Sequence, residues 1–128
     1  MQTFVVIVAG LGALAHVYFA YTEMANWSLA TVGRIAPTWL AGAPSDADHV
    51  VWARRLAFNV GAYNLVLALI LAATAWLSNA AHVAAPVLGL VAAAWLAVAA
   101  LAALATRVVK AFLIQGALAA LLAAGIAL

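Results

Sequence analysis

Residues 83–105, VAAPVLGLVAAAWLAVAALAALA, carry no charged side chain and decide the fold class of this chain. A helix needs roughly 20 consecutive apolar residues to cross the hydrocarbon core of a bilayer, and this stretch is long enough. Pro86 lies close to its start, where a helix tolerates a residue without an N–H because that donor has no partner in the first turn. The stretch therefore predicts a membrane-spanning helix.

The composition of the whole chain agrees with this prediction. Of its 128 residues, 71% are hydrophobic and only 6% are charged, with a formal net charge of +2. A soluble domain has about half apolar and about a quarter charged residues, and a disordered chain has low hydrophobicity and high net charge, so both classes are excluded. The basic residues lie in two segments between apolar stretches, and we expect no nucleic-acid partner.

Apolar stretches of this length occur four times along the chain. We expect membrane-spanning helices at about residues 2–23, 56–77, 83–105 and 109–127. No Lys or Arg precedes the first stretch, which favours a retained helix over a signal peptide. Residues 24–55 join the first two spans outside the membrane. Within them, Ser45 followed by Asp46 resembles a helix start, from which one helix could continue into the second span. The prediction is all-α: an integral membrane four-helix bundle forming a single transmembrane domain over residues 1–128.

Basic residues predict the orientation, because they accumulate in cytoplasmic loops. The first connection carries Arg34, Arg54 and Arg55, and the third carries Arg107 and Lys110, whereas the second carries none. We therefore expect the first and third connections in the cytoplasm and both termini on the non-cytoplasmic side.

Polar side chains inside a span are costly, and each is a candidate for function. The candidates are His16, Glu23, Asn59, Tyr63, Asn64 and Gln115. At a rise of about 1.5 Å per residue, His16, Asn59, Asn64 and Gln115 all lie roughly 5 to 13 Å inside the expected cytoplasmic ends of their helices. The sequence thus predicts a polar pocket in the cytoplasmic half of the bundle, with residues 24–55 over its mouth.

Two of these residues have alternative roles. His16 could be a neutral imidazole that hydrogen-bonds to Asn59, Asn64 or Gln115, or it could be a general acid or base. For Glu23 we favour an ion pair with Arg54 or Arg55, and the alternative is a carboxylate that binds a cationic group or protons. His16 and Glu23 are therefore the candidate catalytic residues, and whether the chain is an enzyme stays open.

No metal or cofactor is expected. The chain has no cysteine, which removes Fe–S clusters and thiolate sites. His16 and Glu23 are separated by about 10 Å of helical rise, too far to ligate one metal ion. A haem would need a second strong ligand, and His49 and His82 are expected outside the bundle core.

The stretches that carry the polar residues are similar to the signatures of a known family. His16-Val17-Tyr18-Phe19, followed by Glu23-Met24 and Trp27, resembles the first-helix signature of small bacterial membrane proteins grouped as domain of unknown function 1304. Asn59-Val60-Gly61-Ala62-Tyr63-Asn64 and Gln115-Gly116-Ala117-Leu118-Ala119 resemble its second-helix and fourth-helix signatures, in the same order and spacing. Val60 stands where the family pattern has glutamine, and Leu118 where it has proline. The resemblance implies a four-helix fold in the bacterial inner membrane and groups the same six candidates, but it implies no reaction.

Four functions remain open. In the favoured one, a lipid, isoprenoid or quinone-like molecule places its polar end against the six candidates while apolar walls hold its tail. The second is an isomerase-type enzyme in which His16 transfers a proton. The third is a small transporter, and the fourth is an accessory subunit that binds partner helices through small residues. The expected partners are the lipid bilayer, an amphipathic small molecule, and either further copies of the chain or another membrane protein.

Overall fold

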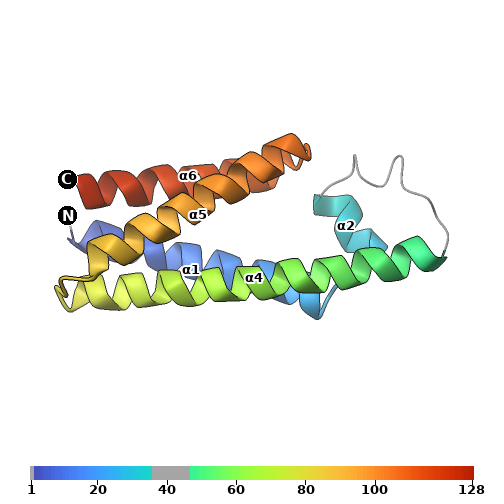
Figure 1. The fold of residues 1–128 in the computed structure, drawn as a ribbon, viewed down its shortest axis with the longest axis horizontal. Helices are drawn as coiled ribbons and strands as arrows, with labels where there is room; N and C mark the ends of the chain where they lie inside the picture. The colour runs from blue at the N-terminus through green and yellow to red at the C-terminus, as the bar shows by residue number, and fades with distance from the viewer. Residues whose placement is uncertain (1, 36–46) are drawn as a thin grey trace.

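The computed structural model describes residues 2–35 and 47–128, and this part of the chain is helical and contains no strand. The helices are α1 (Gln2–Met24), α2 (Leu29–Ile35), α4 (Ala47–Asn79), α5 (Ala85–Ala105) and α6 (Val109–Ala127) (Figure 1). Four helices are long and apolar enough to cross a membrane: α1, α5, α6 and the Ala53–Asn79 part of α4. The prediction of an all-helical chain with four candidate membrane spans is therefore confirmed.

The connection between the first two spans contains more helix than a simple loop. The helix α4 begins at Ala47, so one continuous helix runs from this connection through the second span. Ser45 and Asp46, the expected helix start, lie outside the described residues. The short helix α2 was not expected. It follows Ser28, whose hydroxyl accepts a hydrogen bond from the Thr31 N–H at 3.1 Å, which is an N-cap geometry.

The helices α1 and α4 pack antiparallel along their lengths (Figure 1). At one end the Gln2 side chain donates a hydrogen bond to the Ser78 carbonyl. At the other end Gly61 brings the helices together. A Cβ added there would lie 3.2 Å from the Ala20 carbonyl oxygen and 2.4 Å from Cγ of Met24. Because this spacing leaves no room for a side chain, Gly61 sets how closely the two helices approach.

The turns that reverse the chain direction share one geometry. Ala81 after α4 and Arg107 after α5 have φ of 53° and 61°, in the left-handed region. After α4, the N–H of His82 bonds to the Leu77 carbonyl, and the N–H of Ala81 bonds to the Ser78 carbonyl. The same pair of bonds follows α5. These are Schellman motifs, which satisfy the last carbonyls of a helix.

The core is built from small and aliphatic side chains of all four spans. Its fully buried members are Ala9, Leu67, Leu71, Ala92, Leu96 and Leu122. Large apolar side chains also cover the outside, and Trp95 in the middle of α5 is 46% exposed. A soluble protein rarely exposes apolar surface on this scale, whereas a lipid-facing surface requires it.

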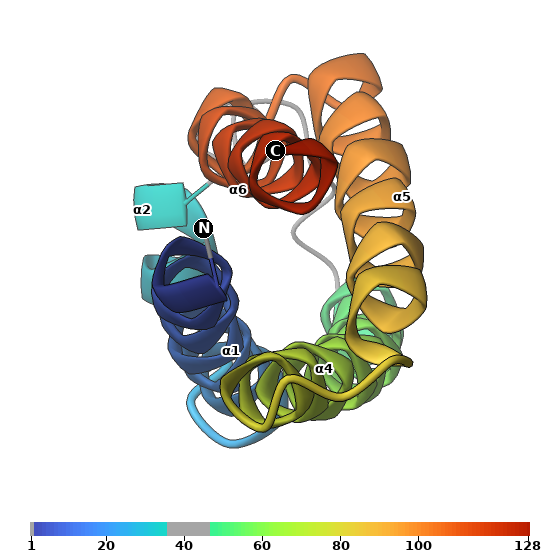
Figure 2. The same cartoon turned by 90° about the vertical axis from the view of Figure 1, so that its left-hand side faces the viewer.

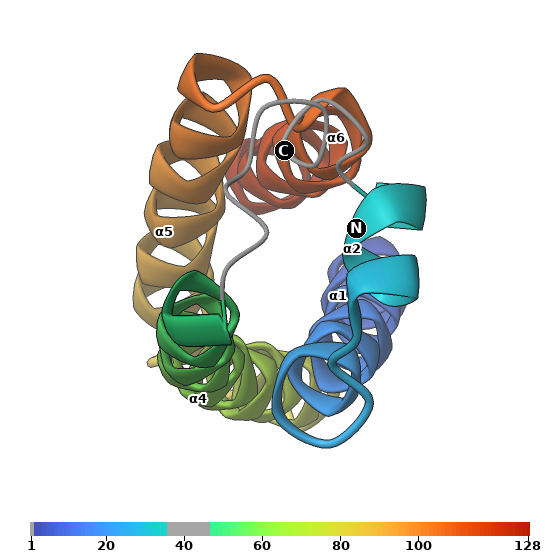
Figure 3. The ribbon, with the colours of Figure 1, turned by 90° about the vertical axis from the view of Figure 1, so that its right-hand side faces the viewer.

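Both termini lie at one end of the bundle (Figure 1). Near the termini α1 and α6 are close together, and they diverge toward the opposite end (Figures 1 and 2). The view from that opposite end places α2 on the side of the bundle formed by α1 and α6, away from α5 (Figure 3). The polar candidates lie in the diverging half.

Candidate functional site

Three of the candidate side chains form a chain of hydrogen bonds between α1 and α4. The Nδ1 atom of His16 lies 2.8 Å from Oδ1 of Asn64. The Asn64 Nδ2 atom donates to Oε2 of Glu23 at 2.6 Å. His16 and Glu23 are seven residues apart on one face of α1, so the single amide of Asn64 bridges the turns between them. Of the three hydrogen-bond partners expected for His16, the structure selects Asn64.

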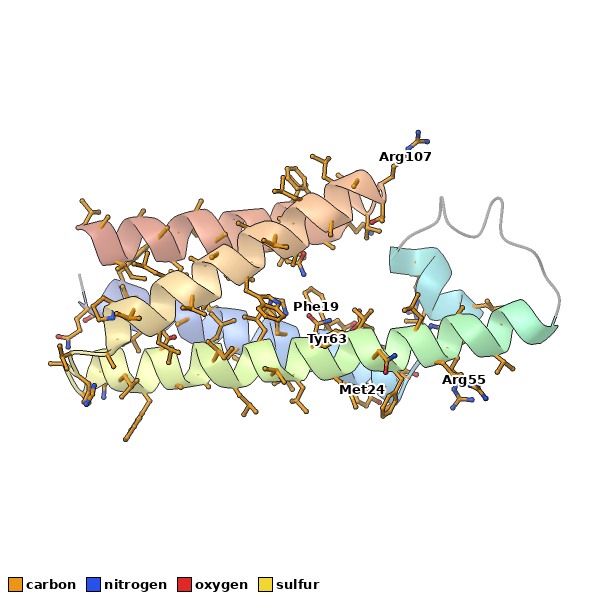
Figure 4. The ribbon with its side chains drawn as sticks, viewed as in Figure 1. Phe19, Met24, Arg55, Tyr63 and Arg107 are labelled. Carbon is orange, nitrogen blue, oxygen red and sulfur yellow. The ribbon has the colours of Figure 1, made fainter. Side chains whose placement is uncertain are left out.

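His16 is held on a second side by an aromatic ring. It is fully buried, with 0% of its surface exposed. The ring of Phe19, three residues later on α1, stands perpendicular to the imidazole with 5.4 Å between ring centroids. Figure 4 shows Phe19 pointing from α1 toward the side of α5 and α6. The ring and the Asn64 hydrogen bond together fix the plane of the imidazole.

Contacts between α1 and α6 establish how these antiparallel helices are aligned. A Cβ added at Gly125 of α6 would lie 3.1 Å from Cγ2 of Val5 on α1. A Cβ added at Gly12 of α1 would lie 3.7 Å from Cδ2 of Leu118 on α6. Val5 and Gly12 are seven residues apart on α1, and Leu118 and Gly125 are seven residues apart on α6. Each residue further along α1 is therefore level with one residue earlier on α6.

This alignment brings Gln115 level with His16. From the contact between Gly12 and Leu118, about one further turn along each helix reaches His16 on α1 and Gln115 on α6. Gln115 is buried, with 8% of its surface exposed. The two residues therefore share one depth, as the sequence predicted.

Two buried polar atoms at this depth have no hydrogen-bond partner among the described residues: Nε2 of His16 and Oε1 of Gln115. Two other buried polar side chains are satisfied within their own helices. The Thr22 hydroxyl donates to the Phe19 carbonyl at 2.8 Å, and the Thr74 hydroxyl donates to the Ile70 carbonyl at 2.9 Å. The unpaired atoms are therefore specific to the His16 and Gln115 level.

Two candidates on α4 lie outside this group. Asn59 is exposed, and Tyr63 is 61% exposed. The helical rotation explains their position, because Asn59 precedes Asn64 by five residues and is therefore turned by about 140° from it. The structure brings together His16, Glu23 and Asn64, places Gln115 level with His16, and leaves Asn59 and Tyr63 exposed on another side of α4.

The expected ion pair of Glu23 with Arg54 or Arg55 is wrong for the described residues. The Glu23 carboxylate accepts its hydrogen bond from Asn64, and both arginines are exposed. Figure 4 shows Arg55 pointing away from the side of α4 that faces the other helices. Arg55 precedes Asn64 by nine residues, which turns it by about 180° around α4.

One residue near the site, Phe19, was not among the candidates predicted from the sequence. Phe19 makes the ring contact with His16 described above. Its position three residues after His16 was the available signal, because residues at this spacing are neighbours on a helix surface.

Neither a metal cluster nor an apolar groove explains the unpaired atoms. Within residues 2–35 and 47–128, no group of three or more His, Cys, Asp or Glu side chains could hold a metal ion. Two open grooves on the bundle surface are lined by apolar side chains. One lies between α1 and α4 and the other between α5 and α6, and neither is lined by His16, Glu23, Asn64 or Gln115.

Comparisons with known proteins identify a family and nothing closer. Neither the curated proteins nor the solved structures include a match to this chain. The model of one family, described as "Protein of unknown function (DUF1304)", matches residues 10–128. This range contains all the residues of the hydrogen-bonded chain as well as Gln115. The protein therefore belongs to the DUF1304 family, as its three motifs indicated.

Proposed function

We propose that this protein binds the polar end of an amphipathic small molecule inside the membrane, at the level of His16 and Gln115. One observation carries the proposal: Nε2 of His16 and Oε1 of Gln115 are buried at the same depth and have no partner among the described residues. They lie on two neighbouring helices, α1 and α6, and one head group inserted between these helices would reach both. The apolar side chains around them suit an alkyl or isoprenoid tail.

The cost of unpaired buried polar atoms favours a bound ligand over an unfilled site. A buried polar atom without a hydrogen bond costs about 1–3 kcal/mol. The hydrocarbon core supplies no bulk water that could replace the missing bond. A head group that reaches both atoms would remove both costs at once, so its binding is favoured at this level of the bundle.

The helix arrangement supports an entry route from the α1 and α6 side. These helices are in contact near the termini and diverge toward the level of His16 and Gln115 (Figures 1 and 2). The short helix α2 lies on the same side, at the far end (Figure 3). Separation of α1 from α6 would therefore admit a molecule from the bilayer without breaking the hydrogen bonds between α1 and α4.

A proton-transfer enzyme is the second candidate, and the same histidine favours it. A general base needs a ring nitrogen without a proton, and the other nitrogen held by a partner that orients the ring. His16 has its Nδ1 bonded to Asn64 and its Nε2 unpaired. An isomerisation of a membrane-dissolved substrate would use Nε2 to move the proton.

The location and orientation are also proposals. We place the chain in a bacterial inner membrane, with both termini on the non-cytoplasmic side. The support is the charge distribution: Arg34, Arg54, Arg107 and Lys110 all lie in or next to the helix ends that are opposite to the termini.

Native mass spectrometry of the protein extracted gently from its own membrane, combined with lipid extraction, tests the binding proposal. We expect one defined small molecule in stoichiometric amount, and its loss in His16→Ala and Gln115→Leu. The matched controls are Val17→Ala and Leu113→Ala, which shorten exposed neighbours of the two residues. Retention of bulk lipid alone, at equal levels in all five proteins, would contradict the proposal.

A further inference from the structure

The chain of hydrogen bonds from Glu23 to His16 determines which kind of head group the site accepts. Glu23 first fixes which end of the Asn64 amide faces it. With Glu23 ionised, its carboxylate oxygens can only accept hydrogen bonds, so the side of the amide that faces Glu23 is then the NH₂ group. The Asn64 Nδ2 and Glu23 Oε2 atoms lie 2.6 Å apart, within hydrogen-bonding distance.

The second step is the position of the histidine proton. With its NH₂ group facing Glu23, Asn64 turns its oxygen toward Nδ1 of His16, at 2.8 Å. This oxygen can only accept, so Nδ1 must carry a proton and donate. In a neutral imidazole the other nitrogen then has none. Nε2 is therefore a bare acceptor, buried and without a partner among the described residues.

We infer that the site selects molecules whose polar end donates a hydrogen bond, namely long-chain alcohols, over ketones, quinones and esters. This inference rests on the proposed function and specifies its ligand. A hydroxyl group donates its proton to Nε2 of His16. It can also accept a hydrogen bond from the Gln115 NH₂ group when the amide turns so that NH₂ takes the place of Oε1, and no hydrogen bond among the described residues holds this amide in one orientation. A ketone oxygen can only accept, so it leaves Nε2 unpaired.

Glu23 is the residue that sets this preference, although it does not touch the ligand. It acts through Asn64 as a positioning residue. In Glu23→Gln, an amide replaces the carboxylate at nearly unchanged size, and it can present either oxygen or NH₂ to Asn64. The orientation of Asn64 is then no longer fixed, and both tautomers of His16 become accessible. We therefore expect Glu23→Gln to bind alcohols and ketones with similar affinity.

The test compares two probes of equal length, hexadecan-2-ol and hexadecan-2-one, on the full chain in lipid nanodiscs. Binding is measured by native mass spectrometry for the wild type, Glu23→Gln and Val17→Ala. We expect the wild type and Val17→Ala to prefer the alcohol by about tenfold or more, because the ketone leaves a buried acceptor unpaired. In Glu23→Gln the preference should fall to within about threefold, since either tautomer can then form.

A second measurement reads the tautomer without any ligand. In protein with ¹⁵N-labelled histidine, the His16 signals are assigned by their loss in His16→Gln, and they should show a protonated Nδ1 and a bare Nε2. A proton on Nε2, or equal affinity of the wild type for both probes, would overturn the inference while binding itself stands. If neither probe binds and no lipid is retained, both the inference and the proposed function fail.

Discussion

The close approach of α1 and α4 at Gly61 gives a prediction whose size can be worked from the structure. Gly61 of α4 lies against the C-terminal end of α1. A Cβ at this position would lie 2.4 Å from Cγ of Met24, 3.2 Å from Cβ of Glu23 and 3.2 Å from the Ala20 carbonyl oxygen. The Met24 side chain can rotate away, but the other two atoms belong to the body of α1. In Gly61→Ala the two helices must therefore move apart.

The expected destabilisation follows from two opposing contributions. Overpacking costs about 1–3 kcal/mol, and alanine recovers about 1 kcal/mol through its higher helix propensity. The control is Gly10→Ala on α1, where an added Cβ meets nothing within 4 Å. That variant should show only the gain in propensity. We therefore expect Gly61→Ala to be less stable than Gly10→Ala by about 1–3 kcal/mol.

The assay is reversible unfolding in mixed micelles of a mild detergent and SDS, followed by helical circular dichroism. Because Glu23 is one of the displaced neighbours, Gly61→Ala should also weaken the bond between Glu23 and Asn64 and reduce the preference for alcohol over ketone. Equal stability of the Gly61→Ala and Gly10→Ala variants would refute the helix spacing described here.

Three further predictions concern single residues, each checked by the same unfolding assay. Asn64→Leu should destabilise by about 1–3 kcal/mol, because it leaves His16 and Glu23 without their partner; no change would show that these bonds do not form. Gln115→Leu should be as stable as the wild type or more so, since its buried oxygen makes no bond that could be lost, and a large loss would point to an unseen partner. Ala81→Gly should stabilise by about 1 kcal/mol, because the left-handed conformation penalises a Cβ; a destabilised variant would contradict the turn geometry.

The four spans could be predicted because lipid imposes a simple requirement on sequence. Backbone polar groups must be satisfied within each helix, and the surface must be apolar, so length and hydropathy identify α1, α5 and α6 directly. The helix α2 is too short to give such a signal. Its one local mark is Ser28 three residues before Thr31, the spacing of its N-cap bond.

The depth of the polar residues in the membrane could be predicted, but the side of the helix on which each one faces its neighbours could not. Counting along each helix placed His16 and Gln115 in one layer, and their alignment across α1 and α6 agrees. The spans are apolar on every side, so no polar face indicates which side points inward. For this reason Asn59 was grouped with Asn64, although the first is exposed and the second bonds to two residues of α1.

The choice of partners also requires the packed structure. Glu23 was paired with an arginine because both were expected near one membrane face. On α4, Arg55 lies about 14 Å along the axis from Asn64 and on its opposite side. Asn64 donates to the Glu23 carboxylate instead. The difference matters for function, because an arginine partner of Glu23 would not have fixed the orientation of Asn64 and hence the tautomer of His16.

Photolabelling tests the central claim, a binding site at the level of His16 and Gln115, most directly. The probe is a long-chain alcohol with a diazirine next to its hydroxyl, added to the protein in nanodiscs, irradiated and mapped by peptide mass spectrometry. We expect labelling around Phe19 and Gln115 that excess unlabelled alcohol suppresses and that His16→Ala abolishes. Labelling confined to the outer groove between α1 and α4, for example at Leu14 and Leu69, and unaffected by competitor, would contradict it.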